Sequence, residues 1–186
     1  EILKKDLRTS HIPTIILTAL NSKESYIKGL ESGADLFLTK PFSFSILSQS
    51  IKTLIYNREK LRYYFVNNVH KIESSNTFGS LEQEFISSVN KIIDENIDNS
   101  KFSVENLASN LNISRVQLYR KMKAIIGENV SDYIQNIRLE KAKNLLLESQ
   151  LTISAIAYAT GFSSPNYFST SFKSKFKKTP KAFRED

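Results

Sequence analysis

The feature that most constrains the fold of this chain is a pattern that occurs twice in its second half. A short segment with a central alanine, Ala108 or Ala157, is followed by a tight turn and a second helical segment. An alanine at the packing position lets two helices approach closely at a fixed angle, and Gly161 can take the positive φ that a sharp turn requires. The sequence therefore predicts two helix-turn-helix motifs, joined by a long helix over residues 130–149.

Polar residues indicate where these helices begin, because Ser and Thr side chains accept hydrogen bonds from the free amides of a first helical turn. Ser103 and Ser114 are suited to cap the two helices of the first motif. Thr152 or Ser154 would begin the second motif. From Leu81 onward, apolar residues at helical spacing predict a preceding helix; they are Phe85, Val89, Ile92 and Ile93.

The last helix of the second motif divides into two faces. Phe162 is expected to fill the space between the two helices of this motif. Three aromatic residues would anchor the inner face: Tyr167, Phe168 and Phe172. The outward residues would be Asn166, Ser169, Thr170 and Lys173. Aromatic side chains thus hold the helix on the domain and leave a polar face free.

Positive charge is segregated along the second half. The chain has a net charge of +7 and a pI near 9.5, and neither residues 106–127 nor residues 149–184 contain Asp or Glu. The basic residues singled out in these windows are Arg115, Arg120, Lys121, Lys123, Lys173, Lys175, Lys177, Lys178, Lys181 and Arg184. A face without carboxylates does not repel phosphate, and each Lys or Arg contact releases counterions. The pattern predicts double-stranded DNA as the partner.

In a helix-turn-helix motif the second helix enters the major groove. Two motifs joined by one helix would insert about one helical turn apart, roughly 34 Å. Arg120 is suited to grip guanine bidentately and Asn166 to bind adenine. An alternative from a different class stays open, namely a protein-interaction module whose basic helices bind an acidic partner.

The first part of the chain has a different pattern. Two apolar runs, residues 13–19 and 34–42, read as short buried strands of a parallel sheet, with Tyr26, Ile27 and Leu30 at helical spacing between them. Ser43 or Ser45 would cap a further helix that continues to Phe65; its stripe is Ile46, Leu47, Ile51, Leu54, Ile55, Arg58 and Leu61. Residues 69–80 lose this periodicity, which indicates a linker.

Several function classes lack their signatures. The chain has no cysteine, and its two histidines, His11 and His70, stand apart without metal-ligand spacing. It has neither a phosphate-cradling glycine loop nor a G-x-S-x-G motif. We therefore expect no enzyme activity, cofactor, metal or small-molecule substrate in this chain, which starts at Glu1 and reads as a fragment. No membrane-spanning run or leader is evident, so a cytoplasmic location is expected.

Residues 81–186 resemble the AraC/XylS family of bacterial transcription regulators. The segments that carry the resemblance are LASNLNISRVQLYRKMKAIIG, SDYIQNIRLEKAKNLL and ISAIAYATGFSSPNYFSTSFKSKFKKTPKAF. The family reads DNA with the second helix of each motif, which implies base-facing and backbone-contacting roles here. The predicted DNA-binding set is Ser114, Arg115, Val116, Tyr119, Arg120, Lys123, Pro165, Asn166, Thr170 and Lys173. Two positions depart from the family, Lys177 where glycine is usual and Gln135 where arginine is frequent.

The first segment resembles the C-terminal half of a response-regulator receiver domain, through IPTIILTA and GADLFLTKPF. The resemblance implies that Thr18 and Lys40 belong to a phosphoryl site and that the Lys40–Pro41 bond is cis. The phosphoacceptor aspartate and its acidic Mg²⁺ pair are expected on strands before this chain, because Asp6 lies too close to the Thr18 strand. Thr18 and Lys40 would then be remnants of that site.

The expected organisation is a partial receiver over residues 1–66, a linker over 67–80 and an AraC-type domain over 81–186. The fold class is mainly α, an all-α domain with two helix-turn-helix motifs, preceded by a partial α/β segment of two βα units. A receiver joined to such a domain resembles the end of hybrid two-component sensors, which implies a response-regulator output role in a phosphorelay. The parent protein would be anchored in the inner membrane. We also expect homodimerisation through residues 10–65, with RNA polymerase as a further candidate partner.

Overall fold

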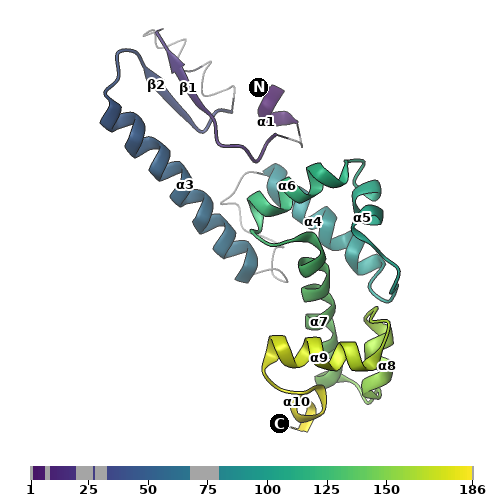
Figure 1. Ribbon diagram of the computed structural model, residues 1–186. Coiled ribbons are helices and arrows are strands. Elements are labelled where there is room, and N and C mark those ends of the chain that lie inside the picture. Colours follow the sequence, from purple (N-terminus) through teal and green to yellow (C-terminus); the bar gives the residue numbers. More distant parts are fainter. Residues whose placement is uncertain (1, 7–8, 20–26, 28–32, 68–79, 186) are drawn as a thin grey trace. The chain divides into compact units, whose positions relative to one another are not determined.

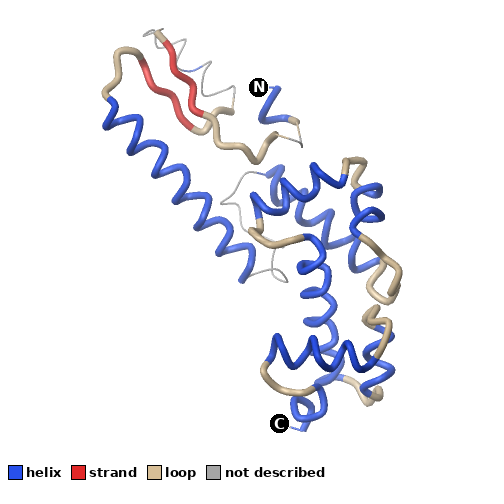
Figure 2. The backbone as a smooth tube through the Cα atoms, viewed as in Figure 1, coloured by secondary structure: helices blue, strands red, loops and turns tan. Residues whose placement is uncertain are grey.

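The described part of the protein is mainly helical, with one small two-stranded sheet (Figures 1 and 2). The computed structural model describes residues 2–6, 9–19, 27, 33–67 and 80–185. The elements of the first part are α1 (Ile2–Lys5), β1 (Ile15–Thr18), β2 (Leu36–Thr39) and α3 (Phe44–Asn67). Those of the second part are α4 (Ser80–Glu95), α5 (Val104–Asn110), α6 (Arg115–Ile125), α7 (Val130–Glu148), α8 (Ile153–Ala159), α9 (Pro165–Phe176) and α10 (Pro180–Glu185).

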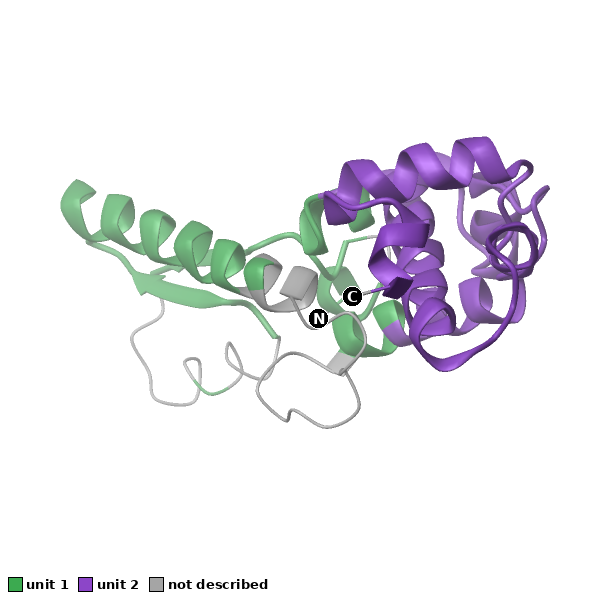
Figure 3. Cartoon of the chain, turned by 90° about the horizontal axis from the view of Figure 1, so that it is seen from below, with its two compact units in different colours: residues 1–86, 120–127 green, residues 87–119, 128–186 purple. Residues whose placement is uncertain are grey.

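The chain divides into two compact units (Figure 3). Unit 1 contains residues 1–86 and 120–127, and unit 2 contains residues 87–119 and 128–186. Both α4 and α6 therefore contribute to both units. The proposed linker falls largely on residues 68–79, which lie outside the described residues, so the domain boundary at 67–80 stays a prediction. None of the described helices is long and apolar enough to cross a bilayer.

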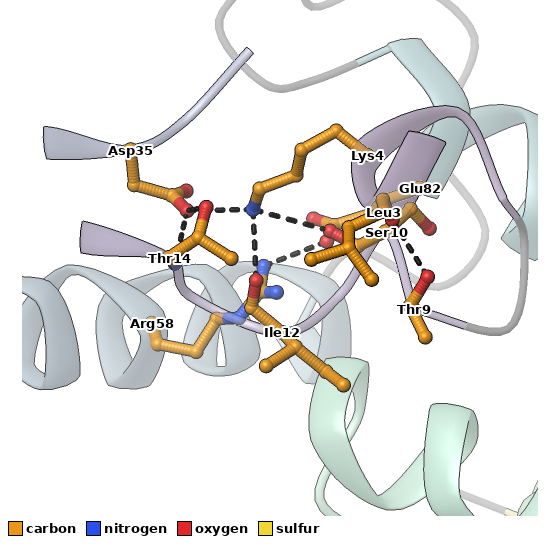
Figure 4. Close-up of polar contacts among 9 residues, drawn as sticks. All are labelled: Leu3, Lys4, Thr9, Ser10, Ile12, Thr14, Asp35, Arg58 and Glu82. Carbon is orange, nitrogen blue, oxygen red and sulfur yellow. Dashed lines mark hydrogen bonds and ion pairs between the residues drawn. The ribbon is translucent and has the colours of Figure 1, made fainter. Parts of the chain in front are cut away.

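Unit 1 contains the two predicted strands, β1 and β2, which pair in parallel from Ile15 opposite Leu36 to Thr18 opposite Thr39. Asp35 secures the start of this sheet, because its Oδ2 accepts a hydrogen bond from the Thr14 amide at 2.7 Å and pairs with Lys4 Nζ at 2.6 Å (Figure 4). Burial tends to raise the pKa of Asp35, but the hydrogen bonds from Lys4 and Thr14 outweigh it and lower that pKa. The helix predicted around Tyr26 and Leu30 lies outside the described residues.

The prediction that both strands are buried is wrong. Ile16 and Leu17 on β1 are 36% and 43% exposed, and Ile51 and Ile55 on α3 are exposed as well. A continuous apolar run is typical of a strand that is covered on both faces. The described residues form a sheet of only two strands, which is too small to enclose such a run.

The start of α3 follows the predicted capping. The Ser43 hydroxyl accepts a hydrogen bond from the Ile46 amide at 3.3 Å, so Ser43 rather than Ser45 caps the helix. The helix ends at Asn67, two residues beyond the predicted end. Arg58, on the inner side of α3, pairs with Glu82 of α4 at 2.7 Å (Figure 4).

One hydrophobic cluster of unit 2 lies between the long helix α7 and the second motif. Its buried members are Leu139, Ala142, Leu146, Ile156, Ala157, Phe162, Phe168 and Phe172. The rings of Phe162 and Phe168 lie 5.1 Å apart and those of Phe168 and Phe172 5.6 Å apart. Phe183 of α10, a helix that the sequence reasoning missed, stacks edge-on against Phe172 at 5.5 Å. These contacts confirm that aromatic side chains anchor the second motif.

Candidate nucleic-acid interface

The first motif consists of α5, a tight turn and α6. Ser103 caps α5 in a reciprocal arrangement with Asn106, in which the Ser103 hydroxyl accepts from the Asn106 amide and the Asn106 side chain accepts from the Ser103 amide. The turn closes when the Ile113 amide donates to the Ala108 carbonyl at 3.1 Å, with Asn112 at φ 53°. Ala108 is buried, which confirms its predicted packing role.

The turn of the second motif has the same main-chain hydrogen bond and a positive φ at the equivalent residue. The Phe162 amide donates to the Ala157 carbonyl at 2.9 Å, and Gly161 has φ 73°. Thr152 caps α8 through the Ala155 amide at 3.1 Å, which decides between Thr152 and Ser154. Residues of α5 and its turn thus correspond to residues 49 positions later in the chain.

The recognition helices α6 and α9 correspond with a shift of 50, because the second turn has one additional residue. Ser114 and Ser164 are the equivalent caps, each accepting a hydrogen bond from the amide three residues later, at 3.2 Å from Gln117 and 3.3 Å from Tyr167. The same shift pairs the predicted DNA-binding residues of the two helices. The pairs are Arg115 with Pro165, Val116 with Asn166, Arg120 with Thr170, and Lys123 with Lys173.

The predicted reading residues of α6 lie on its outward side. Ser114, Arg115, Val116, Arg120 and Lys123 are exposed and Tyr119 is half-buried. The Arg115 guanidinium pairs with Glu105 at 2.8 Å and lies 5.5 Å from the centre of the Tyr119 ring. Sequence reasoning did not assign Glu105 a role, although it is the last acid before the acid-free window.

Lys121 departs from the predicted basic face, because it is only 1% exposed. Its Nζ lies 4.4 Å from the centre of the Phe85 ring and donates to the Ser10 hydroxyl at 3.1 Å. Burial lowers the pKa of Lys121, and the positive charge of Arg58 adds to this effect, while Glu82 and Asp6 oppose it. His11 lies nearby, and burial together with Lys121 lowers the pKa of His11 to about 4. Lys121 is therefore a packing residue of unit 1.

On α9, Asn166, Thr170 and Lys173 are exposed as predicted, and Pro165 is half-buried at the first helical position. The Thr170 hydroxyl donates back to the Asn166 carbonyl at 3.0 Å, so it is engaged by its own helix. The prediction for Ser169 is only partly met, since it is half-buried. Asn166 is thus an outward side chain of the first turn of α9 that has both a donor and an acceptor.

The inward placement predicted for Tyr167 is wrong, because this residue is 53% exposed. Its ring packs against Phe162 at 5.9 Å and its hydroxyl donates to Gln135 Oε1 on α7 at 3.3 Å. A ring edge on the core and a hydroxyl at the surface is the usual compromise for tyrosine. Gln135, the departure from the family pattern, is thus the side chain that holds Tyr167.

Lys177 takes the left-handed conformation that usually favours glycine, with φ 64° at the end of α9. Its amide donates to the Lys173 carbonyl at 2.9 Å and its Nζ to the Ser174 carbonyl at 2.8 Å. The equivalent position after α6 is Gly127, with φ 87°. A lysine therefore makes the turn that leads into α10.

Thr18 and Lys40 meet at the carboxyl end of the two parallel strands. The Lys40 amide donates to the Thr18 carbonyl at 2.7 Å, and the Lys40–Pro41 peptide bond is cis. The cis bond agrees with what the receiver resemblance implied, the Lys40 side chain is exposed, and the place of Thr18 and Lys40 in a phosphoryl site stays a prediction. Among the residues that the structure describes, no group of three or more His, Asp or Glu side chains is arranged to hold a metal ion.

Comparisons with known proteins place these motifs among helix-turn-helix proteins. A family profile described as a helix-turn-helix domain matches residues 107–186. Histidine kinase P4 of Formosa agariphila is 37% identical over 182 residues, which are 98% of this chain and 13% of that protein. The C-terminal domain of the two-component response regulator yesN from Fusobacterium nucleatum is 36% identical, with a TM-score of 0.51, over 54% of this chain and 98% of that one. The DNA-binding domain of AdpA, solved in complex with a target DNA, is 25% identical, with a TM-score of 0.50, over 53% of this chain and 88% of that one.

Proposed function

We propose that this chain, whose C-terminal part is similar to AraC-type helix-turn-helix transcription regulators, is the sequence-specific DNA-binding output part of a two-component system. The observation that carries this proposal is the repeated geometry of the two motifs. Both turns have the same hydrogen bond to a buried alanine, and both recognition helices begin at an equivalent serine cap. Two equivalent helices that expose equivalent positions suit two successive major-groove contacts.

In this proposal the side chains of α6 and α9 divide the work of binding. Arg120 reads guanine and Asn166 reads adenine, because each can make two hydrogen bonds to its base. Arg115, Lys123 and Lys173 contact phosphates. The remaining positions line the groove: Ser114, Val116, Tyr119, Pro165 and Thr170.

The finer parts of the proposal concern the parent protein. A receiver joined to the DNA-binding part would receive a phosphoryl group in a phosphorelay and control dimerisation, so that two chains bind one promoter cooperatively. The exposed apolar side chains of β1 and α3, such as Leu17 and Ile55, support association between copies. RNA polymerase is the further partner that a transcription activator would contact. The cytoplasmic location of this part, and membrane anchoring of the parent, follow from the same proposal.

The proposal is tested by selecting binding sites from a random duplex pool, with the full chain and with Arg120→Ala, at about 50 and 200 mM salt. We expect two enriched elements about one helical turn of DNA apart, and Arg120→Ala should weaken the base preference at one position of one element. At that position the preference should fall by about 1–3 kcal/mol. Lys141→Ala is the matched control, because Lys141 is an exposed cation on α7 and not on either recognition helix.

Two outcomes would contradict the proposal. Salt-dependent binding without an enriched sequence would show that the basic faces supply only charge. Equal effects of Arg120→Ala and Lys141→Ala on binding to acidic proteins, with no DNA preference, would favour the protein-interaction module instead.

A further inference from the structure

Arg138 lies in the middle of α7, the helix of unit 2 that follows the first motif in the chain and precedes the second. Its Nη2 donates a hydrogen bond to the Asn99 carbonyl at 2.7 Å. The same carbonyl accepts the Phe102 amide at 3.0 Å, and Phe102 is buried directly before Ser103, the cap of α5. Arg138 therefore holds the segment through which the chain enters the first motif.

The turn of the second motif closes on the same place from the other side. A Cβ atom on Gly161 would lie 2.3 Å from the Ile97 carbonyl oxygen and 2.8 Å from Arg138 Cζ. The backbone of this turn therefore lies directly against the entry segment of the first motif and against the guanidinium. Since Gly161 also has a positive φ, both its conformation and the space around it require glycine.

A cavity of about 360 Å³ lies next to this contact and has walls from both motifs. Glu105 and Arg115 line it from the first motif, and Ser163 and Tyr167 from the second. Gln135 and Arg138, which are about one helical turn apart on α7, also line this cavity. Gln135 accepts a hydrogen bond from the Tyr167 hydroxyl at the start of α9, and Arg138 donates to the segment before α5, so one face of α7 contacts both motifs.

The Arg138 side chain is not fully satisfied in its hydrogen bonding. Its Nε is buried and has no hydrogen-bond partner among the described residues. An unsatisfied buried donor is costly, and a buried guanidinium stays charged. Burial accordingly lowers the pKa of Arg138, although the group remains a cation at any ordinary pH. The planar guanidinium of Arg138 instead forms a rigid contact between the segment at Asn99 and the Gly161 turn.

We propose that Arg138 is a positioning residue that fixes the two motifs relative to each other, and so determines the spacing between the two DNA elements that this chain accepts. This inference rests on the proposed DNA-binding function. The Arg138 guanidinium lies between the Asn99 carbonyl and the Gly161 turn. It therefore holds the two motifs in one mutual arrangement. Without it, each motif keeps its own core and its own outward residues, and the arrangement between them loosens.

The test measures affinity on duplexes that carry the two elements enriched by the unaltered chain, with the spacer shortened or lengthened by one and two base pairs. We expect the unaltered chain to prefer one spacing by about 5–150-fold, the range of ordinary coupling between two sites. Arg138→Met keeps most of the side-chain volume but removes the hydrogen bond. In this variant the preference should fall by about fivefold or more, with affinity for each single element within about twofold.

Arg184→Met is the matched control. Arg184 also donates through Nη2 to a backbone carbonyl, that of Leu151, at 2.7 Å, and it too has a buried Nε without a partner among the described residues. Its contact joins α10 to the segment before α8 and does not involve the first motif, so its loss should lower stability without changing the preferred spacing. An effect of Arg184→Met on spacing equal to that of Arg138→Met would overturn the inference.

The remaining outcomes are decisive as well. If the unaltered chain enriches no pair of elements, the proposed function fails and the inference fails with it. If it enriches a pair and Arg138→Met keeps the same spacing preference, only the inference fails. Should Arg138→Met not fold, as judged by circular dichroism, Arg138→Lys replaces it, because lysine keeps the charge but loses the plane. Failure of both variants to fold would assign Arg138 to stability alone and overturn the inference.

Discussion

The two helix-turn-helix motifs share a backbone but differ in what their recognition helices carry. At equivalent positions α6 has Arg120 where α9 has Thr170, and Arg115 where α9 has Pro165. In the core, Phe168 and Phe172 of α9 occupy the positions that Leu118 and Met122 hold in α6. The first motif therefore concentrates charge at its surface, and the second concentrates aromatic packing in its core.

This difference explains how a repeated fold can serve two roles. Backbone turns and caps are set by small and polar residues, which both motifs keep in equivalent places, as at Ser114 and Ser164. Outward side chains do not affect those turns, so they are free to differ. We infer that the first motif contributes more to phosphate binding and the second more to a well-ordered framework.

The largest expected effect tests the turns themselves. Gly161→Ala places a methyl group against the Ile97 carbonyl at a position with φ 73°, and should lower the free energy of unfolding of unit 2 by about 3–5 kcal/mol. A change at the corresponding position of the first turn, Asn112→Gly, should alter it by less than about 1 kcal/mol, because Asn112 already has a positive φ of 53°. Urea denaturation of both variants checks the contrast, and equal effects would contradict the conclusion that the space around Gly161 requires glycine.

The next effect concerns reading by α9. Asn166→Ala should weaken the base preference at one position of the second element by about 1–3 kcal/mol. Thr170→Ala should change it by less than about 0.5 kcal/mol, because the Thr170 hydroxyl is engaged by the Asn166 carbonyl. Competition binding with single-base variants of the selected site measures both changes. A larger effect from Thr170→Ala would mean that this hydroxyl leaves its helix to meet DNA.

What the sequence could predict depended on distance along the chain. The caps at Ser103 and Thr152 and the turns after Ala108 and Ala157 involve neighbours within a few residues, and all are confirmed. The two strands were also found, because their apolar runs are local. Their burial was wrong, since burial is decided by what other segments cover the sheet.

The candidate site shows the same division. Exposure of Arg120 and Asn166 followed from helical periodicity and is confirmed. The burial of Lys121 could not be predicted from helical periodicity, because it depends on Phe85 and on Ser10, which lies 111 residues away in sequence. An acid-free window counts charges without saying which of them pack inward. The roles in DNA binding stay predictions until the site selection is done.

The third effect is a pH dependence of stability that should differ between α6 and α9, because α6 carries the buried cation Lys121 beside His11 and α9 has no such pair. Burial and Lys121 lower the pKa of His11 to about 4, with smaller contributions from Arg58 and Lys4. The unfolded chain binds a proton near pH 6.5 while the folded chain does not, so stability falls as pH decreases from about 6.5 towards 4. Between pH 7 and 5 the loss should be about 1–2 kcal/mol.

Amide hydrogen exchange at the two pH values measures this effect within one molecule. After correction for the intrinsic exchange rate, the free energy of opening at Met122 of α6 should fall, and that at Phe172 of α9 should not. His11→Gln should remove the difference. A parallel change at both amides would contradict the assignment of the effect to His11.

The smallest effect concerns the ends of the recognition helices, where Gly127 follows α6 and Lys177 follows α9 at the equivalent position. Lys177→Gly removes the strain of a left-handed lysine, and we expect unit 2 to gain about 0.5–1 kcal/mol. The reverse exchange, Gly127→Lys, should cost about 1 kcal/mol, because the φ of 87° at Gly127 suits glycine more strictly than the φ of 64° at Lys177. Thermal unfolding of both variants gives the two values. Destabilisation by Lys177→Gly would mean that the hydrogen bond from Lys177 Nζ to the Ser174 carbonyl outweighs the backbone strain, so that the lysine itself secures the end of α9.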